Sequence, residues 1–417
     1  MMVSDKFQVT VIGGGMITEI QLLPVLYHMQ RSGLISDIHI CALDGARLAE
    51  LRSAQSLAGA FPGQSFIPHP DPDKVDPKQK CPDLYKEVLA GALKGSIAVI
   101  ATPDQLHYEM LQVAIDCDLH VCIVKPLVLK YAQAEDIAKR AYERGLLIGI
   151  EYHKRFDHRS LMARKAYREG RLGEFRLAQA QMIEPYYYRD SNFQNWCTCE
   201  NTDMFTYVGC HYVDLVAFIT GLKPVSVSVY GIRDRYPNGN EGFLWTDGRV
   251  IWENGASLSV VDAIGYPSGA AGGNAQGLTM WCQGDEDAAL LVHDDQFRGV
   301  KCHYNTAGNQ PGDTKYAEPN PDYFQLIDQG GVGLTPVGYG CRSVEYIIQS
   351  CLRAASSSSL TERQKLIRQY DKEGIMATPG NSSYNELVIE AARMSILNGG
   401  REVVIDNKTP SVRFRDF

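Results

Sequence analysis

Residues 7–18, FQVTVIGGGMIT, decide the fold class of this 417-residue chain. The apolar and β-branched residues at the start predict a short buried strand, and the three glycines after it predict a tight turn. Residues 19–33, EIQLLPVLYHMQRSG, have helical spacing of their apolar side chains, so the turn joins a strand to a helix. A strand, a glycine turn and a helix in this order are typical of the start of a doubly wound α/β domain.

The same alternation continues to residue 126. Its strands have continuous apolar runs, which indicate a parallel sheet covered by helices on both faces. The predicted strands and helices are 37–44 (DIHICALD), 46–61 (ARLAELRSAQSLAGAF), 96–103 (SIAVIATP), 107–118 (HYEMLQVAIDCD) and 120–126 (HVCIVKP). Residues 61–83, rich in Pro, Asp and Lys, are interpreted as a surface excursion within this domain. The sequence therefore predicts a dinucleotide-binding Rossmann domain over residues 1–127.

The pattern changes in residues 128–417, where alternating strands dominate. A helix (131–145) and a strand (146–153) come first, followed by several strands joined by Gly, Asn and Asp turns. Strands in such a series predict a large, mostly antiparallel sheet. Residues 382–400 predict an amphipathic helix that begins at serines and ends at glycines. We expect a second, α+β domain for substrate binding and oligomerisation.

Composition restricts the class of partner. The chain is 45% hydrophobic and 22% charged, and its net charge of −8 argues against a surface for nucleic acid or anionic membrane. No run of eighteen apolar residues predicts a transmembrane helix, and the start shows no signal peptide. The 11 scattered cysteines suggest reduced thiols, and the lone C-x-C at Cys197 and Cys199 predicts no metal site. A cytoplasmic location is expected.

The glycine turn is the first candidate site. Gly13 and Gly15 match the first two glycines of the dinucleotide fingerprint, where backbone must approach the pyrophosphate, while Thr18 replaces the third. Met16 and Ile17 follow the glycines and are also expected to bind the cofactor.

Asp44 ends the second predicted strand, where a carboxylate accepts both hydroxyls of the adenosine ribose and repels the 2′-phosphate of NADP. NAD is therefore favoured over NADP. A solvated turn aspartate is the plain structural alternative, and Arg47 nearby keeps NADP open.

Two further strand ends reach the same edge of the sheet, where doubly wound folds bind ligands. One carries Thr102, Pro103 and His107, and the other carries Lys125. All four are expected to bind the cofactor, and Lys125 is expected beside the nicotinamide. The alternative for Lys125 is that the strand simply ends there and the ammonium group reaches water.

A third cluster lies in residues 202–221, TDMFTYVGCHYVDLVAFITG. Asp203, Tyr207 and His211 are spaced four residues apart, so a regular helix would place them on one face. Such a stripe suits removal of a hydroxyl proton during alcohol oxidation. A helix with a structurally satisfied histidine is the alternative.

Taken together, the chain resembles the glucose–fructose oxidoreductase / inositol dehydrogenase family (Gfo/Idh/MocA). The resemblance rests on VIGGGMI, IATPDQLHYEMLQVAI, HVCIVKPL, YHKRFD, GRLGEF, GCHYVDLVAFITG and NELVIEAARMSI. It implies that Lys125 is the active-site lysine of the family's E-K-P motif, although Val124 replaces the glutamate. It also implies that His211 is the family's histidine, with Tyr207 where an aspartate is expected, so that Tyr207 or Asp203 takes that role or the site has drifted. The resemblance implies substrate contacts from His153 and Arg155.

What the resemblance implies for function is an NAD-dependent oxidoreductase that moves a hydride between a secondary hydroxyl of a sugar, glycoside or polyol and nicotinamide. Lys125 would stabilise the reacting oxygen and His211 would accept the proton. Two alternatives stay open: a redox-neutral enzyme with retained NAD and a transient ketone, and a non-catalytic nucleotide-binding regulator. Relatives usually pair through the open face of the large sheet, so a homodimer or homotetramer is expected.

Overall fold

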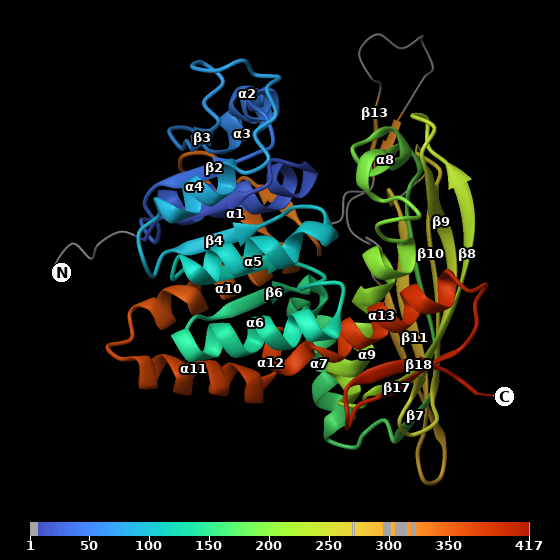
Figure 1. Ribbon diagram of the computed structural model, residues 1–417. Coiled ribbons are helices and arrows are strands. Elements are labelled where there is room, and N and C mark those ends of the chain that lie inside the picture. The colour runs from blue at the N-terminus through green and yellow to red at the C-terminus, as the bar shows by residue number, and fades with distance from the viewer. Residues whose placement is uncertain are drawn as a thin grey trace. The chain divides into compact units, whose positions relative to one another are not determined.

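The computed structural model describes residues 7–268, 270, 272–294, 302–304, 315–317 and 322–416. The chain divides into two compact units, which are interleaved along the sequence (Figure 1). The first unit takes residues up to 128 together with 132–156 and 323–382, and the second takes 129–131, 157–322 and 383–417.

The first unit is built on a six-stranded sheet whose order is β3-β2-β1-β4-β5-β6. Every neighbouring pair is parallel. The strands are β1 (Val9–Ile12), β2 (Ile38–Cys41), β3 (Ile67–His69), β4 (Ile97–Ile100), β5 (His120–Val124) and β6 (Ile148–Glu151). This topology confirms the predicted doubly wound Rossmann sheet.

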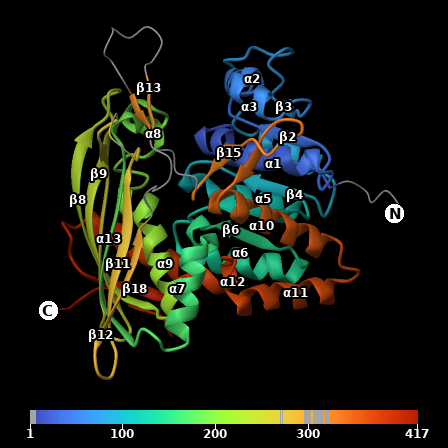
Figure 2. The same cartoon turned by 180° about the vertical axis from the view of Figure 1, so that it is seen from behind.

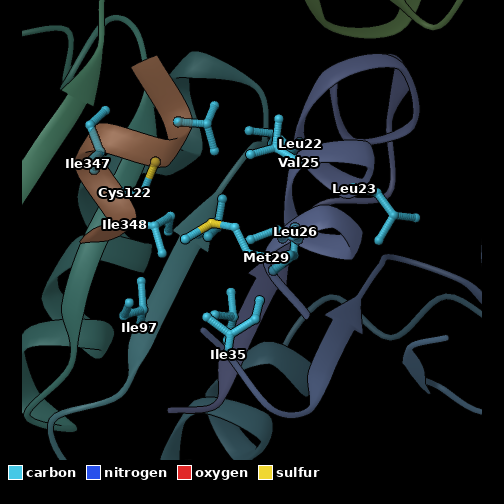
Figure 3. Packing of buried hydrophobic residues seen from close by; sticks show 14 of the residues in the cluster. Leu22, Leu23, Val25, Leu26, Met29, Ile35, Ile97, Cys122, Ile347 and Ile348 are labelled. Atoms are coloured by element: carbon cyan, nitrogen blue, oxygen red, sulfur yellow. The ribbon is translucent and has the colours of Figure 1, made fainter. Parts of the chain in front are cut away.

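Helices cover both faces of this sheet. On the face seen in Figure 1 lie α4 (Leu84–Ala90), α5 (His107–Asp116) and α6 (Tyr131–Arg144). The opposite face, seen in Figure 2, carries α1 (Leu23–Arg31) and α10 (Tyr339–Ala355). Their apolar side chains meet over the strands in one buried cluster, in which Met29 and Ile348 are both fully buried (Figure 3).

The domain boundary expected at residue 127 leaves out parts of the chain that belong to this first unit. Strand β6, assigned above to the second domain, is the sixth strand of the first sheet. Helix α10 comes from the far end of the chain and still packs on the same sheet. A Cβ at Gly149 would lie 2.5 Å from Ile347 Cγ2, so the glycine allows this close approach of helix to strand. The apolar run before Glu151 continues the βαβ pattern, which explains why β6 joins β5.

The second unit contains an eight-stranded sheet of order β12-β11-β7-β10-β9-β8-β17-β18. Only the β7–β10 pair is parallel among its seven neighbouring pairs, which gives the mixed, mostly antiparallel sheet that the sequence predicts. The strands are β7 (Glu174–Pro185), β8 (Pro224–Arg235), β9 (Glu241–Trp252), β10 (Ser257–Tyr266), β11 (Ala275–Gln283), β12 (Ala288–Asp294), β17 (Val403–Asp406) and β18 (Ser411–Phe414). Helix α9 (Cys210–Thr220) and helix α13 (Tyr384–Ile396) lie against one face of it (Figure 1).

The remaining helices and strands complete the described chain. They are η1 (Thr18–Leu22), α2 (Gly45–Ser53), α3 (Gln55–Ala60), η2 (Asp104–Leu106), η3 (His153–Phe156), α7 (His158–Arg168), η4 (Tyr186–Asp190), α8 (Phe193–Trp196), η5 (Phe205–Gly209), β13 (Cys302–Tyr304), β14 (Lys315–Ala317), β15 (Gln325–Ile327), β16 (Thr335–Val337), α11 (Leu360–Glu373) and α12 (Pro379–Ser382). In the described part of the chain, no helix combines the length and apolarity needed to cross a membrane.

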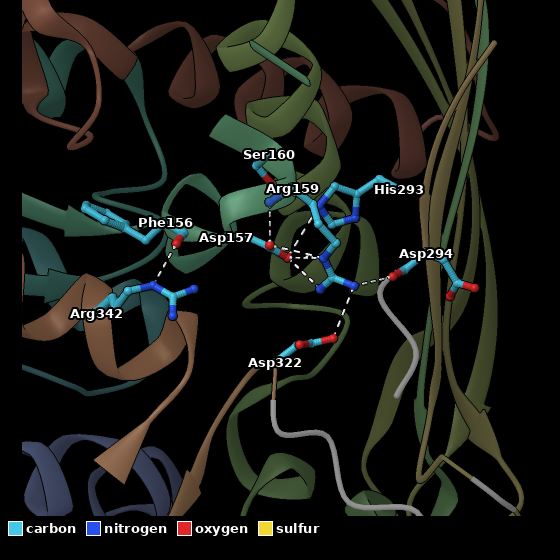
Figure 4. Close-up of polar contacts among 8 residues, drawn as sticks. All are labelled: Phe156, Asp157, Arg159, Ser160, His293, Asp294, Asp322 and Arg342. Carbon is cyan, nitrogen blue, oxygen red and sulfur yellow. Dashed lines mark hydrogen bonds and ion pairs between the residues drawn. The ribbon is translucent and has the colours of Figure 1, made fainter. Parts of the chain in front are cut away.

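A polar cluster fixes the start of α7 in the second unit (Figure 4). Asp157 caps the helix and pairs with Arg159, whose Nη2 lies 2.6 Å from Asp157 Oδ2. The same guanidinium donates to the carbonyl of Asp294 at 2.7 Å and pairs with Asp322 at 3.3 Å. Arg159 thereby holds two points of the chain that are far apart in sequence beside the start of α7.

Candidate active site

The glycine turn after β1 has the geometry of a phosphate-binding turn. Gly13 has a φ of +112°, and a Cβ there would lie 2.1 Å from the carbonyl oxygen of Ala101. Only glycine fits, since the turn passes directly over the end of β4. A Cβ at Gly15 would meet no described atom within 4 Å, which leaves space beside this backbone. Thr18, which stands where the fingerprint has its third glycine, donates from Oγ1 to the Gly13 carbonyl at 2.7 Å and closes the turn.

The helix after this turn begins at Met16, three residues before the helix expected over 19–33. Its next turn is a π-helix, η1, which then continues as α1. The first amides of a helix have no partner within it and carry the positive end of its dipole. The turn and helix start therefore suit a pyrophosphate.

Asp44 caps α2, and its carboxylate accepts a hydrogen bond from the Arg47 amide at 3.2 Å. Its other oxygen forms an ion pair with Lys80, from the excursion at 61–83. Burial acts to raise the pKa of Asp44, but the hydrogen bonds from Lys80 and the Arg47 amide outweigh burial and lower it. Asp44 is thus an ionised carboxylate at the end of β2, where a ribose is expected.

Two neighbouring strand ends lie beside the turn. Thr102 and Pro103 follow β4, and the half-buried Lys125 follows β5. His107 is fully buried, and its two ring nitrogens lie 2.8 Å from the Pro126 carbonyl oxygen and 2.9 Å from that of Thr102. A neutral imidazole donates to only one of these carbonyls, so His107 is hydrogen-bonded to one strand end and packs against the other. These contacts favour a structural role for His107 over the direct cofactor contact that the sequence suggested.

Sequence reasoning missed a buried carboxylate at the end of β6. Glu151, only 3% exposed, is the register partner of Val124, the position where the resemblance expects a glutamate. Its Oε1 accepts hydrogen bonds from Gln21 Nε2 at 3.0 Å and Ser343 Oγ at 2.5 Å. Because these donors come from η1 and α10, one carboxylate joins three elements of the first unit. Its signal was the same as that of Lys125, a charged residue at the end of an apolar strand.

His153 lies beside this carboxylate. Its Nδ1 is 3.2 Å from Glu151 Oε2, and its ring packs against Tyr323 and Tyr339, with centroids 5.2 and 5.5 Å away. The sequence could not predict these tyrosines, which lie some 170 or more positions further along the chain. Arg155, the other predicted substrate contact of this segment, is only 2% exposed.

In the second unit, Asp203 is fully buried and stands just before η5. Its carboxylate accepts from the Thr206 amide at 2.8 Å and from Thr206 Oγ1 at 3.2 Å. Burial raises the pKa of Asp203 more than these hydrogen bonds lower it. Asp203 thus acts as a cap for this helix, which favours a structural role over substrate binding.

Tyr207 and His211 do not lie on one regular helix. Tyr207 belongs to the π-helical turn η5, whereas His211, 2% exposed, belongs to α9. The expected four-residue spacing on one face was therefore wrong in its assumption of an unbroken α-helix, because a π turn rotates the following residues. The Tyr207 ring packs edge-on against Phe193 and Trp196, with centroids 4.9 and 5.4 Å away.

These residues fit an NAD(P) molecule in the first unit. The turn at Gly13 and Gly15 has room at its backbone, a helix starts behind it, and Asp44 is ionised at the end of β2. Among the residues that the structure describes, no group of three or more His, Cys, Asp or Glu is arranged to hold a metal ion.

Comparison with known proteins identifies the family. Residues 7–152 match the family described as "Oxidoreductase family, NAD-binding Rossmann fold", and residues 160–272 match the "GFO/IDH/MocA C-terminal domain". The chain belongs to the Gfo/Idh/MocA oxidoreductase family. The resemblance inferred from the sequence motifs is thereby confirmed, and the first unit carries an NAD(P)-binding Rossmann domain.

Two relatives with a named activity are distant in sequence. The scyllo-inositol 2-dehydrogenase (NADP(+)) of Bacillus subtilis is 23% identical over 231 residues, which are 55% of this chain and 59% of that protein. The D-glucoside 3-dehydrogenase of Escherichia coli is 22% identical over 229 residues, 54% of this chain and 57% of that protein. The chain thus matches less than two thirds of the length of these relatives.

Solved structures share the whole fold. GenD2 from gentamicin A biosynthesis, in complex with NAD, has a TM-score of 0.64 at 16% identity and covers 97% of this chain and 98% of its own. The scyllo-inositol dehydrogenase of Lactobacillus casei, with NAD(H) and scyllo-inositol, has a TM-score of 0.59 at 15% identity, covering 96% and 99%. At these identities the likeness concerns the fold.

Proposed function

We propose that this family member is an NAD-dependent oxidoreductase acting on a secondary hydroxyl of a sugar, glycoside or polyol. One observation carries the proposal. The register of β1, β4 and β5 pairs Ile12 with Ile100 and Ile100 with Ile123, so the Gly13 turn, Thr102 and Lys125 leave one edge of one sheet. A cationic side chain is thereby placed at the ligand edge of the cofactor domain. The activities of the two distant relatives named above support a carbohydrate as substrate class.

The proposed chemistry assigns a role to each side chain. Nicotinamide, when bound, supplies the hydride acceptor or donor. Lys125 donates a hydrogen bond to the reacting oxygen and stabilises the negative charge that develops there. His211 accepts the hydroxyl proton, for which a neutral imidazole is suited at neutral pH. Tyr207 hydrogen-bonds the substrate or His211 in place of the family's aspartate, and His153 and Arg155 bind the substrate.

A substrate panel tests the proposal. Purified protein is mixed with NAD or NADP and with hexoses, glycosides, inositols and uronic acids, and nicotinamide absorbance is followed together with product formation. Reduction of NAD by a carbohydrate supports the proposal. Product without net absorbance change, with NAD retained through purification, indicates the redox-neutral alternative. Nucleotide binding with no product from any compound indicates the non-catalytic regulator.

We further propose that the protein is a homodimer or homotetramer, in the cytoplasm, paired through the second sheet. Apolar side chains are exposed on strands of this sheet: Leu177, Tyr230, Ile232, Val261, Trp281, Leu290 and Val292. Trp281 is the register partner of both Leu177 and Leu290, so three of these apolar side chains adjoin on one face, which supports a protein interface.

A further inference from the structure

The excursion after β3 is fastened to the end of β2 and the start of α2. The Ala46 amide donates to the Pro77 carbonyl at 2.8 Å, and the Cys81 amide donates to the Leu43 carbonyl at 2.8 Å. Residues 70–83 are therefore not a loose loop beside the cofactor domain. They form a fixed segment next to Asp44, which we call the wall (residues 70–83).

Side chains reinforce this attachment. Arg52 of α2 forms a two-pronged ion pair with Asp73, with N–O distances of 2.8 and 2.9 Å. Gly45 lies so close to the excursion that a Cβ would be 3.2 Å from Pro72 Cα. The excursion thus has a defined position relative to the carboxylate of Asp44.

Lys80 is the cation that the wall brings to this carboxylate. Its ammonium pairs with Asp44 Oδ2, and its side chain remains 62% exposed while that of Asp44 is 17% exposed. Arg47, the cation that the sequence suggested for NADP, is held elsewhere. Its Nε donates to the Gly14 carbonyl at 2.6 Å, and its terminal nitrogens pair with Glu19 and Glu50.

NAD and NADP differ at the 2′ position of the adenosine ribose, which is a hydroxyl in one and a phosphate in the other. A carboxylate offers about four acceptor positions, so Asp44 can accept ribose hydroxyls while it keeps Lys80 and the Arg47 amide. Against a 2′-phosphate, Asp44 is repulsive and Lys80 attractive. The two side chains therefore act in opposite directions on NADP.

We propose that Lys80 and Asp44 together distinguish the 2′-phosphate of NADP from the 2′-hydroxyl of NAD. The ratio of the NADP and NAD affinities then depends on Lys80 and not on Arg47. The inference rests on the cofactor part of the proposed function. Asp44 keeps NAD the preferred form, and Lys80 limits how strongly NADP is rejected. No turnover is needed to test it, because the readout is binding.

The experiment is a calorimetric titration of the full chain with NAD and with NADP. Lys80→Ala is expected to raise the Kd for NADP about tenfold, or about 1.4 kcal/mol, and the Kd for NAD less than about threefold. The matched control is Lys78→Ala, which removes an exposed lysine of the same wall and should change neither Kd. Arg47→Ala is expected to weaken both nucleotides alike, because Arg47 supports the glycine turn.

The Asp44→Asn variant and the salt dependence of binding test the same proposal independently. Asp44→Asn should tighten NADP at least about tenfold while Lys80 is present, and clearly less in the double variant, since the two charges are coupled. The effect of Lys80→Ala on the Kd for NADP should become smaller as salt rises from about 0.05 to 0.5 M, because salt screens the interaction between the ammonium and the phosphate. Thermal melts on the same samples show that each variant is folded.

The outcomes separate the two hypotheses. If Lys80→Ala leaves the NADP to NAD ratio unchanged while both nucleotides bind, the role of Lys80 is overturned and the cofactor assignment stands. If neither nucleotide binds the wild-type chain, the cofactor part of the proposed function fails, and the role of Lys80 fails with it.

Discussion

At the scale of single residues, Lys125 carries the proposed chemistry. Lys125→Met keeps a similar side-chain volume and removes the ammonium group, so turnover should fall at least about a hundredfold if that group stabilises the reacting oxygen. Steady-state kinetics, NAD titration and thermal melts measure the effect. Lys130→Met, an exposed lysine five residues on, is the control and should behave as wild type. Near-normal turnover of Lys125→Met would contradict the catalytic role and support the alternative, in which the strand ends at Lys125 and its ammonium group reaches water.

Tyr207 gives a second prediction at this scale. Phenylalanine keeps the ring packing against Phe193 and Trp196 and removes only the hydroxyl. Tyr207→Phe should therefore lower turnover with carbohydrate while NAD affinity and the melting temperature stay unchanged. Asp203→Asn should instead lower stability, because the amide can still cap the helix but loses the ion pair with Arg393 and the acceptor for Thr206 Oγ1. If Tyr207→Phe stays active while Asp203→Asn is stable but inactive, Asp203 has the catalytic role and Tyr207 does not.

Residue types were predictable here where a strand end or a turn required them. Gly13 was expected from the turn, and its φ and its distance from Ala101 show why no other residue fits. The partners of these residues were not predictable, since they are set by tertiary contacts. Lys80 on Asp44 and Ser343 on Glu151 come from segments 36 and 192 positions away in sequence.

At the scale of elements, two of the helices with candidate site residues share an irregularity. Each has a π turn near its start, η1 before α1 and η5 before α9. A π turn contains one residue more than an α turn, and such turns are frequent at functional sites. Apolar periodicity does not reveal one extra residue near a helix start. The four-residue spacing of Asp203, Tyr207 and His211 therefore predicts a single face, which holds only for a regular α-helix.

The contact between β6 and α10 gives the prediction at this scale. Gly149→Ala should destabilise the protein by about 1–3 kcal/mol, since its Cβ would overlap Ile347 in a packed core. Gly59→Ala in α3 is the matched control, because no described atom lies within 4 Å of its Cβ. There the change should be neutral or stabilise by up to about 1 kcal/mol. Urea unfolding of both variants measures the difference, and equal midpoints would contradict the close packing.

At the scale of the whole molecule, the fold class was predictable from the sequence and the division of the chain was not. Apolar strands and intervening helices indicated the parallel sheet, and both sheets formed as expected. The return of residues 323–382 to the first unit could not be predicted, because an amphipathic helix does not specify the sheet it covers. Helix α10 has an apolar stripe of the kind that any sheet face could bury.

Fragments test this division. Residues 1–156 alone should be poorly soluble and should fail to bind NAD, because the sheet face beneath α10 would be exposed. Joining residues 323–382 to this fragment through a flexible linker should restore a cooperative melt and NAD binding. Circular dichroism and nucleotide titration of the two fragments give the comparison. A folded, NAD-binding fragment 1–156 would show that the returning segment is dispensable.

The second sheet gives a prediction for assembly. Leu290 and Val292 are 58% and 61% exposed on β12. The pair of changes Leu290→Glu and Val292→Glu should convert the proposed dimer or tetramer to a smaller species, because charges on an apolar interface are costly to bury. Light scattering coupled to gel filtration measures the mass. Glu174→Ala, an exposed polar position on β7, is the control and should keep the wild-type mass.

The return of the chain to its first unit also has a consequence for synthesis in the cell. A ribosome finishes β6 long before it makes α10, and about 190 residues separate them. At a rate of about 5–20 residues per second, the helix that covers one face is made roughly 10–40 s after the six strands. During that interval the apolar face of the nascent sheet is open to chaperones and to other nascent chains, so the protein is expected to depend on its translation rate more than a fold completed in sequence order.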